Sequence, residues 1–255
     1  MSHRILILGG TTEARQLAGR LAARPDVELT LSLAGRTENP VAQPVPMRAG
    51  GFGGADGLAA YLKDNQTDLL IDATHPYAAR ISTNAAKAAR LAGVPILALR
   101  RPGWERREGD RWTEVDGAAN AAVALGPAAR RVFLALGRQD VGVFEAAAHH
   151  HYLLRSVDPV EPPLGIPGVD YLLARGPFDE ADEHRLLIEH RIDVIVSKNS
   201  GGEATYGKIA AARALGIEVV MIRRPVLPTV PSAAGIVELL AMVDHSLRPV
   251  AERGV

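Results

Sequence analysis

The stretch that decides the fold is Ile5-Leu6-Ile7-Leu8-Gly9-Gly10-Thr11-Thr12-Glu13-Ala14. Its apolar residues predict a strand buried on both faces, and residues 12–23 predict a helix. The glycines between them let the backbone approach a pyrophosphate closely, and the free N–H groups that open the helix would bind it. The spacing is not G-x-G-x-x-G, so a tight turn capped by threonine, without a ligand, is the alternative interpretation.

Short apolar runs alternate with alanine-rich runs along the rest of the chain. Alternating strands and helices predict βαβ units with parallel strands, so we expect an α/β fold. The expected strands are 5–8, 28–33, 47–49, 69–73, 94–99, 132–136, 152–157, 171–174, 194–197 and 218–222. The expected helices are 12–23, 58–65, 81–92, 141–148, 180–190, 205–215 and 233–245.

A pattern of helix, strand and Arg-Arg-Pro occurs twice at one constant spacing. Residues 88–102 correspond to residues 211–225, so that Arg100-Arg101-Pro102 recurs as Arg223-Arg224-Pro225. The repeat predicts two Rossmann-like halves that arose by internal duplication, although two α/β units can also converge on such a pattern. We expect an NADP-binding domain over residues 1–102 and a second Rossmann-like domain over residues 103–255.

Parallel sheets bind ligands at the carboxyl ends of their strands. These ends carry the loops 9–12 and 74–77 in the first half, and 137–140 and 198–202 in the second. We therefore expect the active site in the cleft between the two halves, where the four loops would meet.

The composition excludes several classes of function. Formal net charge is zero, which argues against nucleic acid as the main partner. There is no cysteine, so disulfides, thiolate metal sites and cysteine nucleophiles are excluded. The apolar run before Gly9 is too short for a signal peptide, and no run approaches a membrane span of about 18 residues. A cytoplasmic protein without membrane contact is expected.

Gly35-Arg36-Thr37 follows the second expected strand, where an NAD enzyme would carry an acidic residue for the ribose. An arginine suits a ribose 2′-phosphate, so Arg36 and Thr37 favour NADPH over NADH. The following Glu38 weakens this inference, and a solvated loop arginine is the alternative. The glycine cluster Gly50-Gly51-Phe52-Gly53-Gly54 fits a backbone that passes near a cofactor and fits a flexible loop equally well.

Two polar loops carry the remaining candidate residues. Thr74-His75-Pro76-Tyr77 ends a strand, where His75 and Tyr77 could bond a ligand or transfer protons. Lys198-Asn199-Ser200-Gly201-Gly202 occupies the equivalent place in the second half and could bind an anion. The alternatives are a simple helix entry for the first loop and a solvated loop for the second.

His149-His150-His151 invites a metal interpretation. Adjacent strand-like residues point to opposite faces, so the three side chains cannot converge on one ion without an unusual loop. We expect a surface loop here and no metal site.

Three segments of the chain resemble the precorrin-6A reductase family of cobalamin biosynthesis, in the family's order. They are ILGGTTEARQLA (residues 7–18), IDATHPYAARIS (residues 71–82) and VSKNSGGEATYGKIAAARALGIEVVMIRRP (residues 196–225). THPYA and KNSGG are the specific motifs, whereas the glycine turn is shared widely. The chain departs from the family at Ala204 or Thr205, at one of which members often carry glycine.

The resemblance implies reduction of one double bond in a ring-contracted tetrapyrrole, with hydride delivered to one carbon and a proton added at its neighbour. The implied cofactor loops are 9–13, 36–37, 74–76 and 198–202. Arg36 fits the NADPH-using, cobalt-free version of the family, and a cobalt-precorrin-6A reductase that uses NADH is the alternative. The proton would come from Tyr77, His75 or water.

The tetrapyrrole is the expected partner. The resemblance also implies a second partner, the next enzyme of the pathway, to which the product would be handed over. Because the substrate carries many carboxylates, we expect cations beside the four loops. The candidates are Arg80, Arg138, Lys198 and Lys208.

Two other classes of function compete with the reductase. A short-chain oxidoreductase of small metabolites would need a Tyr-x-x-x-Lys pair, and the similar pair here, Tyr206 and Lys208, has the wrong spacing. A non-catalytic nucleotide sensor would lose the polar loops of the second half, which this chain keeps at residues 198–202.

Overall fold

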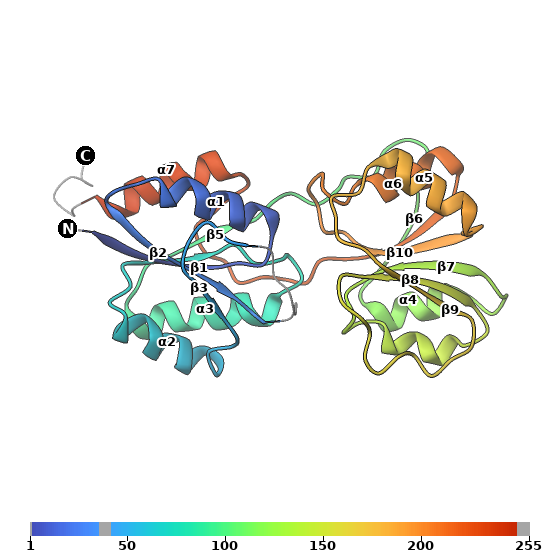
Figure 1. Ribbon diagram of the computed structural model, residues 1–255, viewed down its shortest axis with the longest axis horizontal. Coiled ribbons are helices and arrows are strands. Elements are labelled where there is room, and N and C mark those ends of the chain that lie inside the picture. Colours follow the sequence, from blue (N-terminus) through green and yellow to red (C-terminus); the bar gives the residue numbers. More distant parts are fainter. Residues whose placement is uncertain (1, 36–41, 249–255) are drawn as a thin grey trace. The chain divides into compact units, whose positions relative to one another are not determined.

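The computed structural model describes residues 2–35 and 42–248. The chain forms two compact units, one of Met1–Arg101 with Pro225–Val255 and one of Pro102–Arg224. Each unit contains a six-stranded sheet in which all the neighbouring strands are parallel (Figure 1). The predicted α/β class with two Rossmann-like halves is therefore confirmed.

In the first unit the strand order is β12-β5-β4-β1-β2-β3. The chain leaves the central β1 to build one side of the sheet and then crosses to the other side. Such a reversal of strand order is where open α/β sheets bind ligands, outside the carboxyl ends of the strands. The strands are β1 (His3–Leu8), β2 (Val27–Leu33), β3 (Met47–Ala49), β4 (Leu69–Asp72), β5 (Ile96–Leu99) and β12 (Ser232–Ala233).

Alternate residues of β1 serve the two faces of this sheet. Ile5 and Ile7 pack in one apolar cluster with α1 (Thr12–Ala22) and α7 (Ile236–Leu247). Leu6 and Leu8 pack in another cluster with α2 (Gly54–Asp64) and α3 (Ala79–Ala92). The two pairs of helices lie on opposite faces of the sheet (Figure 1). The continuous apolar run in β1 therefore reflects burial on both faces.

The second sheet has the equivalent order, β6-β11-β10-β7-β8-β9. Helices α5 and α6 cover one face and α4 covers the other (Figure 1). The strands are β6 (Arg111–Val115), β7 (Arg131–Ala135), β8 (His151–Ser156), β9 (Val169–Leu173), β10 (Val194–Lys198) and β11 (Glu218–Ile222). The helices are α4 (Ala118–Ala124), the 3-10 helix η1 (Gly142–Ala147), α5 (Glu180–Glu189) and α6 (Gly207–Leu215).

The C-terminal segment corrects the predicted domain boundary. Residues 103–255 were expected to form one domain, but residues 225–255 belong to the first unit. Strand β12 pairs with β5, with Ser232 opposite Ala98. Leu239 and Val243 of α7 are fully buried in the first unit's core. An apolar stripe on a helix indicates that this side of the helix is buried, but it does not indicate against which sheet. The sequence alone could therefore not assign this segment to a unit.

The two Arg-Arg-Pro stretches mark the places where the chain passes between the units. The unit boundaries fall between Arg101 and Pro102 and between Arg224 and Pro225. The first crossing leads to β6, which pairs with β11, and the second leads to β12, which pairs with β5. Strand β6 follows β5 of the first sheet in the chain but joins the second sheet. Strand β12 follows β11 of the second sheet but joins the first.

Two elements of the second unit are absent from the prediction. Strand β6 buries one residue of its sequence RWTEV, Trp112, and is an edge strand, so it lacks the apolar run used to recognise strands. Helix α4 is short and alanine-rich, without charged residues in its first or last turn. Their signals were therefore too weak to separate from the surrounding polar stretch.

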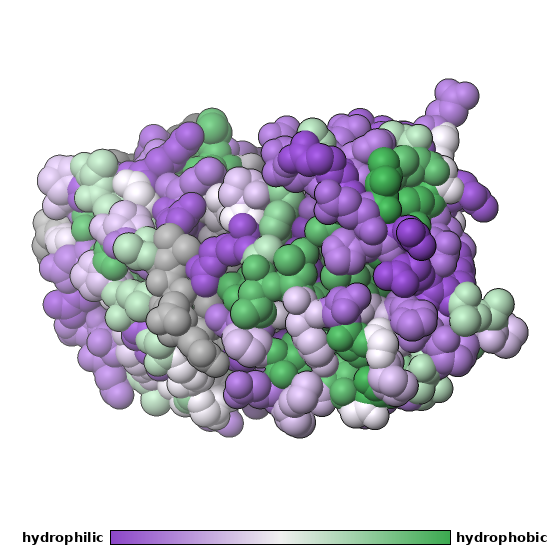
Figure 2. All heavy atoms as spheres, turned by 45° about the vertical axis from the view of Figure 1, so that its right-hand side comes forward, coloured by the Kyte–Doolittle hydropathy of each residue, from purple (hydrophilic) through white to green (hydrophobic). Residues whose placement is uncertain are grey.

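Hydrophilic residues cover much of the face in Figure 2, with hydrophobic patches between them. Among the described residues, no helix combines the length and apolar character that crossing a membrane requires.

The position of α7 leads to a stability prediction. Leu239→Ala should destabilise the protein by about 2–5 kcal/mol, because it opens a cavity in the first unit's core. Val237→Ala, on the exposed side of the same helix, is the matched control and should change stability by less than about 0.5 kcal/mol. Denaturant unfolding followed by circular dichroism measures both variants. Equal effects of the two substitutions would contradict the assignment of α7 to this core.

Candidate active site

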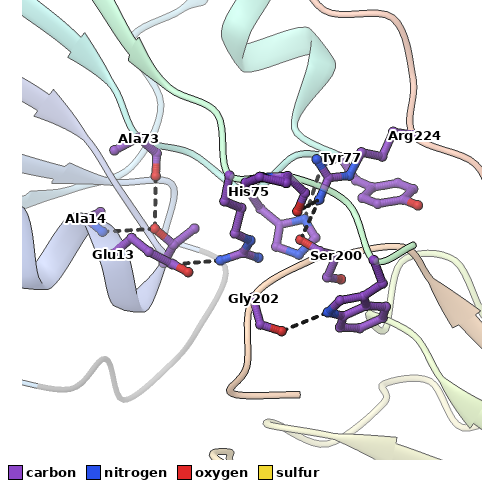
Figure 3. Close-up of polar contacts among 12 residues, drawn as sticks. Glu13, Ala14, Ala73, His75, Tyr77, Ser200, Gly202 and Arg224 are labelled. Atoms are coloured by element: carbon purple, nitrogen blue, oxygen red, sulfur yellow. Dashed lines mark hydrogen bonds and ion pairs between the residues drawn. The ribbon is translucent and has the colours of Figure 1, made fainter. Parts of the chain in front are cut away.

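The turn between β1 and α1 is held by hydrogen bonds to two neighbouring strands. The N–H of Gly9 donates to the carbonyl of Ser32 at 2.9 Å. The hydroxyl of Thr11 accepts from the N–H of Ala14 at 3.0 Å and donates to the carbonyl of Ala73 at 3.0 Å (Figure 3). Thr11 is thus both the helix cap and a bridge to the end of β4, which commits its hydroxyl.

The glycines of this turn are required by its geometry. A Cβ on Gly9 would lie 2.7 Å from Cδ1 of Leu31, and Gly10 has a φ of +113°. A side chain at Gly10 would be strained although the space beside it is open. The turn leaves room for a ligand beside the amino end of α1, the geometry on which dinucleotide-binding sheets rely.

A pocket of about 370 Å³ lies beside this turn, at the carboxyl ends of the strands of the first sheet. Its walls come from the ends of β1, β2 and β3, from Thr74 after β4, and from the first turns of α3. The lining residues are Leu8, Gly9, Ser32, Ala34, Gly50, Gly51, Phe52, Gly53, Gly54, Leu58, Thr74, Arg80, Ile81 and Asn84.

The glycine cluster 50–54 forms one wall of this pocket, which favours the cofactor interpretation of the cluster over the flexible-loop one. Arg48 holds it in shape: its guanidinium donates to the carbonyls of Gly50 at 3.0 Å and Gly51 at 3.2 Å, and to the hydroxyl of Ser32 at 2.9 Å. The same guanidinium lies 3.8 Å from the centre of the Phe52 ring. A loop rich in glycine is thereby ordered by one neighbouring side chain.

Asp72, at the end of β4, fixes the start of the Thr74–Tyr77 loop. It is fully buried, and its Oδ1 accepts from the N–H of Thr74 at 3.1 Å and from the Thr74 hydroxyl at 2.6 Å. Its Oδ2 lies 2.6 Å from the guanidinium of Arg100. Burial opposes ionisation of Asp72, but Arg100 and the hydrogen bonds outweigh burial and lower its pKa.

His75 and Tyr77 lie close together after β4. The N–H of Tyr77 donates to Nδ1 of His75 at 3.3 Å, and the ring centres are 5.7 Å apart (Figure 3). The neutral imidazole therefore carries its proton on Nε2. Both side chains are half-buried, and Pro76 between them is buried.

Glu13 contacts an arginine of its own unit. Its carboxylate lies 2.6 Å from the guanidinium of Arg101, immediately before the first crossing between the units (Figure 3). This pairing offsets negative charge in the first turn of α1, where a phosphate would otherwise be repelled. The predicted cofactor residues Arg36 and Thr37 lie outside the described residues.

In the second unit, Trp104 and Arg224 shape the loop 198–202. Asn199 accepts from the N–H of Trp104 at 2.7 Å and donates to its carbonyl at 2.9 Å, and the Trp104 indole donates to the carbonyl of Gly202 at 2.8 Å (Figure 3). Arg224 donates to the carbonyls of Asn199 at 2.8 Å and Ser200 at 3.0 Å. Gly201 has a φ of +67°, and a Cβ there would lie 2.0 Å from the carbonyl oxygen of Pro102.

The four cations predicted to bind substrate have different surroundings. Arg80 is exposed and lines the pocket of the first unit. Lys198 pairs with Asp140, and its side chain keeps 20% of its surface exposed. Arg138 is half-buried in the loop after β7.

The expectation that Lys208 binds substrate needs correction. This lysine is 4% exposed and lies in the interior of the second unit. Its Nζ donates to the carbonyl of Thr205 at 2.6 Å and lies 4.8 Å from the centre of the Trp104 ring. Burial, with Arg155 nearby, lowers the pKa of Lys208 to about 7. Its ammonium group therefore contacts Thr205, in the loop before α6, and the Trp104 ring from inside the second unit.

The histidine run is only partly the surface loop that was expected. His150 is 2% exposed, and its Nδ1 accepts from the N–H of Arg130 at 3.2 Å, while His151 begins β8. Burial lowers the pKa of His150. Over residues 2–35 and 42–248, no three potential metal ligands of the His, Cys, Asp or Glu type come together.

Several residues of this site were missed at the sequence level. Ser32, Arg48 and Asn84 contribute to the pocket or its wall, and Asp72 and Trp104 support the polar loops. Ser32 and Asp72 stand inside or at the end of strands, where a buried polar residue is itself a signal. No sequence pattern around Arg48 or Trp104 distinguishes these two residues from ordinary loop residues.

The buried lysine predicts a pH dependence of stability. Between pH 7 and its ordinary pKa of 10.5, Lys208 is protonated in the unfolded chain and largely neutral in the folded one. Lys208 therefore lowers the free energy of unfolding less and less as the pH rises through this window. The change is up to about 1.4 kcal/mol per pH unit. The free energy of unfolding of wild type should rise relative to that of Lys208→Met between pH 7 and 10.

Trp104 and Trp112 are the two tryptophans of the chain, and both lie in the second unit. Denaturant unfolding followed by tryptophan fluorescence therefore reports on the unit that contains Lys208. Parallel pH profiles for wild type and Lys208→Met would contradict a depressed pKa for this lysine.

Residues 4–244 of the chain match the protein family described as precorrin-6x reductase CbiJ/CobK. A precorrin-6A reductase of Sinorhizobium sp is 58% identical over 246 residues, covering 96% of this chain and 94% of that protein. One of Rhodobacter capsulatus is 46% identical over 253 residues, covering 99% of each.

The fold leads to the same family. A solved structure described as CobK precorrin-6A reductase matches with a TM-score of 0.92 and 45% identity, covering 96% of this chain and 97% of that one. The resemblance seen in the three sequence segments is therefore confirmed over nearly the whole chain. This chain belongs to the precorrin-6x reductase CbiJ/CobK family.

Proposed function

We propose that the chain is an NADPH-dependent reductase that reduces one double bond of precorrin-6A to give precorrin-6B, the dihydro product, in vitamin B12 biosynthesis. The observation that carries the proposal is the glycine-walled pocket at the point of strand reversal, in a chain whose relatives named precorrin-6A reductase match it almost end to end. Reduction of a carbon–carbon double bond needs a hydride donor, and a dinucleotide suits this edge of the sheet.

The residues of the first unit fit such a nucleotide. The N–H groups of Gly10, Thr12 and Glu13 would hold the diphosphate at the start of α1, and the carboxylate of Glu13 is offset by Arg101. The pocket beside Gly9 would hold part of the remaining nucleotide. When bound, NADPH supplies the hydride.

The loop after β4 would complete the cofactor contacts and hold a proton source. Thr74, His75 and Pro76 follow Asp72, whose buried ion pair with Arg100 keeps the loop in place. We assign His75 and Tyr77 as candidate proton donors, with water as the alternative donor. His75 would donate from Nε2, because its Nδ1 accepts the Tyr77 N–H.

The second unit would bind the tetrapyrrole. Lys198 and Arg138 are the cations we assign to substrate carboxylates, and the loop of Asn199, Ser200, Gly201 and Gly202 would present backbone N–H groups to anions of the substrate or cofactor. The hydrogen bonds from Trp104 and Arg224 give this loop a defined shape. A loop of defined shape helps to position donor against acceptor.

The direct experiment incubates the purified protein with NADPH and precorrin-6A and follows both absorption spectra. We expect nucleotide oxidation that depends on the tetrapyrrole, with one equivalent consumed for each macrocycle reduced. Oxidation that is absent, or that proceeds equally without tetrapyrrole, would remove the reductase assignment. Parallel reactions with NADH and with cobalt-precorrin-6A test the alternative member of the family, which would prefer that pair.

Arg36 is the residue we assign to the ribose 2′-phosphate, on the basis of its position after β2 in the sequence. Arg36→Ala should weaken NADPH more than NADH by about 1.5–3 kcal/mol, through loss of a charge-assisted hydrogen bond. Arg20→Ala, an exposed arginine in the last turn of α1, is the matched control. Steady-state KM values for both cofactors measure the effect, and equal losses for NADPH and NADH would remove Arg36 from this role.

A further inference from the structure

Among the described residues that line the pocket of the first unit, one carries a charged side chain. The lining is otherwise glycine, apolar residues, the hydroxyls of Ser32 and Thr74, and the amide of Asn84. The charge belongs to Arg80, in the first turn of α3. A cation with no carboxylate beside it among the described lining residues favours an anionic ligand.

Among the described residues, Arg80 differs from Arg48, Arg100 and Arg101 at this edge of the sheet in having no protein partner. Within the described part of the chain, no hydrogen bond or ion pair involves its side chain. Arg48, by contrast, is committed to Gly50 and Gly51, Arg100 to Asp72 and Arg101 to Glu13. Helix α3 also has no acidic residue in its first turn, so nothing on that turn neutralises Arg80.

The size of the pocket separates the two anions that Arg80 could meet. A volume of about 370 Å³ is near the lower end of the range for small-molecule sites. It suits the adenosine part of a dinucleotide and is too small to enclose a tetrapyrrole macrocycle. The Phe52 ring, backed by the Arg48 guanidinium at 3.8 Å, gives the pocket an aromatic wall of the kind on which a base can rest.

We propose that Arg80 binds a phosphate of the nucleotide's adenosine half, and not a carboxylate of the tetrapyrrole. The inference rests on the proposed function only in requiring that a nicotinamide dinucleotide binds this unit. It changes the role of Arg80 from substrate contact, as its position in the sequence suggested, to cofactor contact. The phosphate could be the ribose 2′-phosphate or the diphosphate, and the experiment separates the two.

The test measures nucleotide binding by calorimetry without tetrapyrrole, on the full-length protein. Arg80→Gln removes the charge, Arg80→Lys keeps it, and Arg90→Gln, an exposed arginine near the other end of α3, is the matched control. We expect Arg80→Gln to weaken NADPH about tenfold or more, Arg80→Lys to weaken it less, and Arg90→Gln to match wild type. Circular dichroism verifies that the variants are folded.

The ligands NADPH, NADH and 2′,5′-ADP distinguish the two phosphates. A loss seen with NADPH and 2′,5′-ADP but not with NADH assigns Arg80 to the 2′-phosphate, and equal losses for NADPH and NADH assign it to the diphosphate. If Arg80→Gln binds NADPH as tightly as wild type does but has a raised KM for precorrin-6A, the inference about Arg80 is wrong. The proposed function is not affected by that result. If wild type itself binds neither nucleotide, the proposed cofactor fails and this inference fails with it.

Discussion

Strand β1 is hydrogen-bonded to β2 on one side and to β4 on the other, and the candidate site of the first unit depends on this double pairing. All three strands run in the same direction, so their carboxyl ends deliver the turn at Gly9, the residues after β2 and the loop at Thr74 to one edge. Ile5 and Ile7 pack in one apolar cluster and Leu6 and Leu8 in the other, so that β1 contributes to the core on both faces of the sheet.

Arginine side chains then set the conformation of the loops at this edge. Arg48 shapes the glycine wall, Arg100 anchors the loop after β4 through Asp72, and Arg101 pairs with Glu13. In the second unit Arg224 holds the carbonyls of the loop 199–200. These four arginines of the described residues are thus used to build the loops, and each is held by contacts with the protein itself.

The sequence predicted the α/β class, most strands and helices, and the glycine turn, because these depend on local periodicity and on backbone requirements. It did not predict that α7 returns to the first unit, since an apolar stripe such as Leu239 with Val243 fits any open sheet face. The sequence also predicted wrongly that Lys208 contacts substrate. A lysine early in a helix is normally expected to be exposed, and the burial of this one follows from tertiary packing. The pocket around Arg80 combines residues from several strands and helices, and no spacing in the sequence encodes that assembly.

Isotope labelling traces the hydride from the nicotinamide to the tetrapyrrole. NADPH carrying deuterium at either face of nicotinamide carbon 4 is incubated with the protein and precorrin-6A, and the reduced tetrapyrrole is examined by mass spectrometry and NMR. We expect one labelled face to deliver a single deuterium to one carbon of the macrocycle, while the neighbouring carbon takes its proton from solvent. Reduced product without deuterium from either labelled cofactor would contradict direct transfer from a nucleotide bound at this edge.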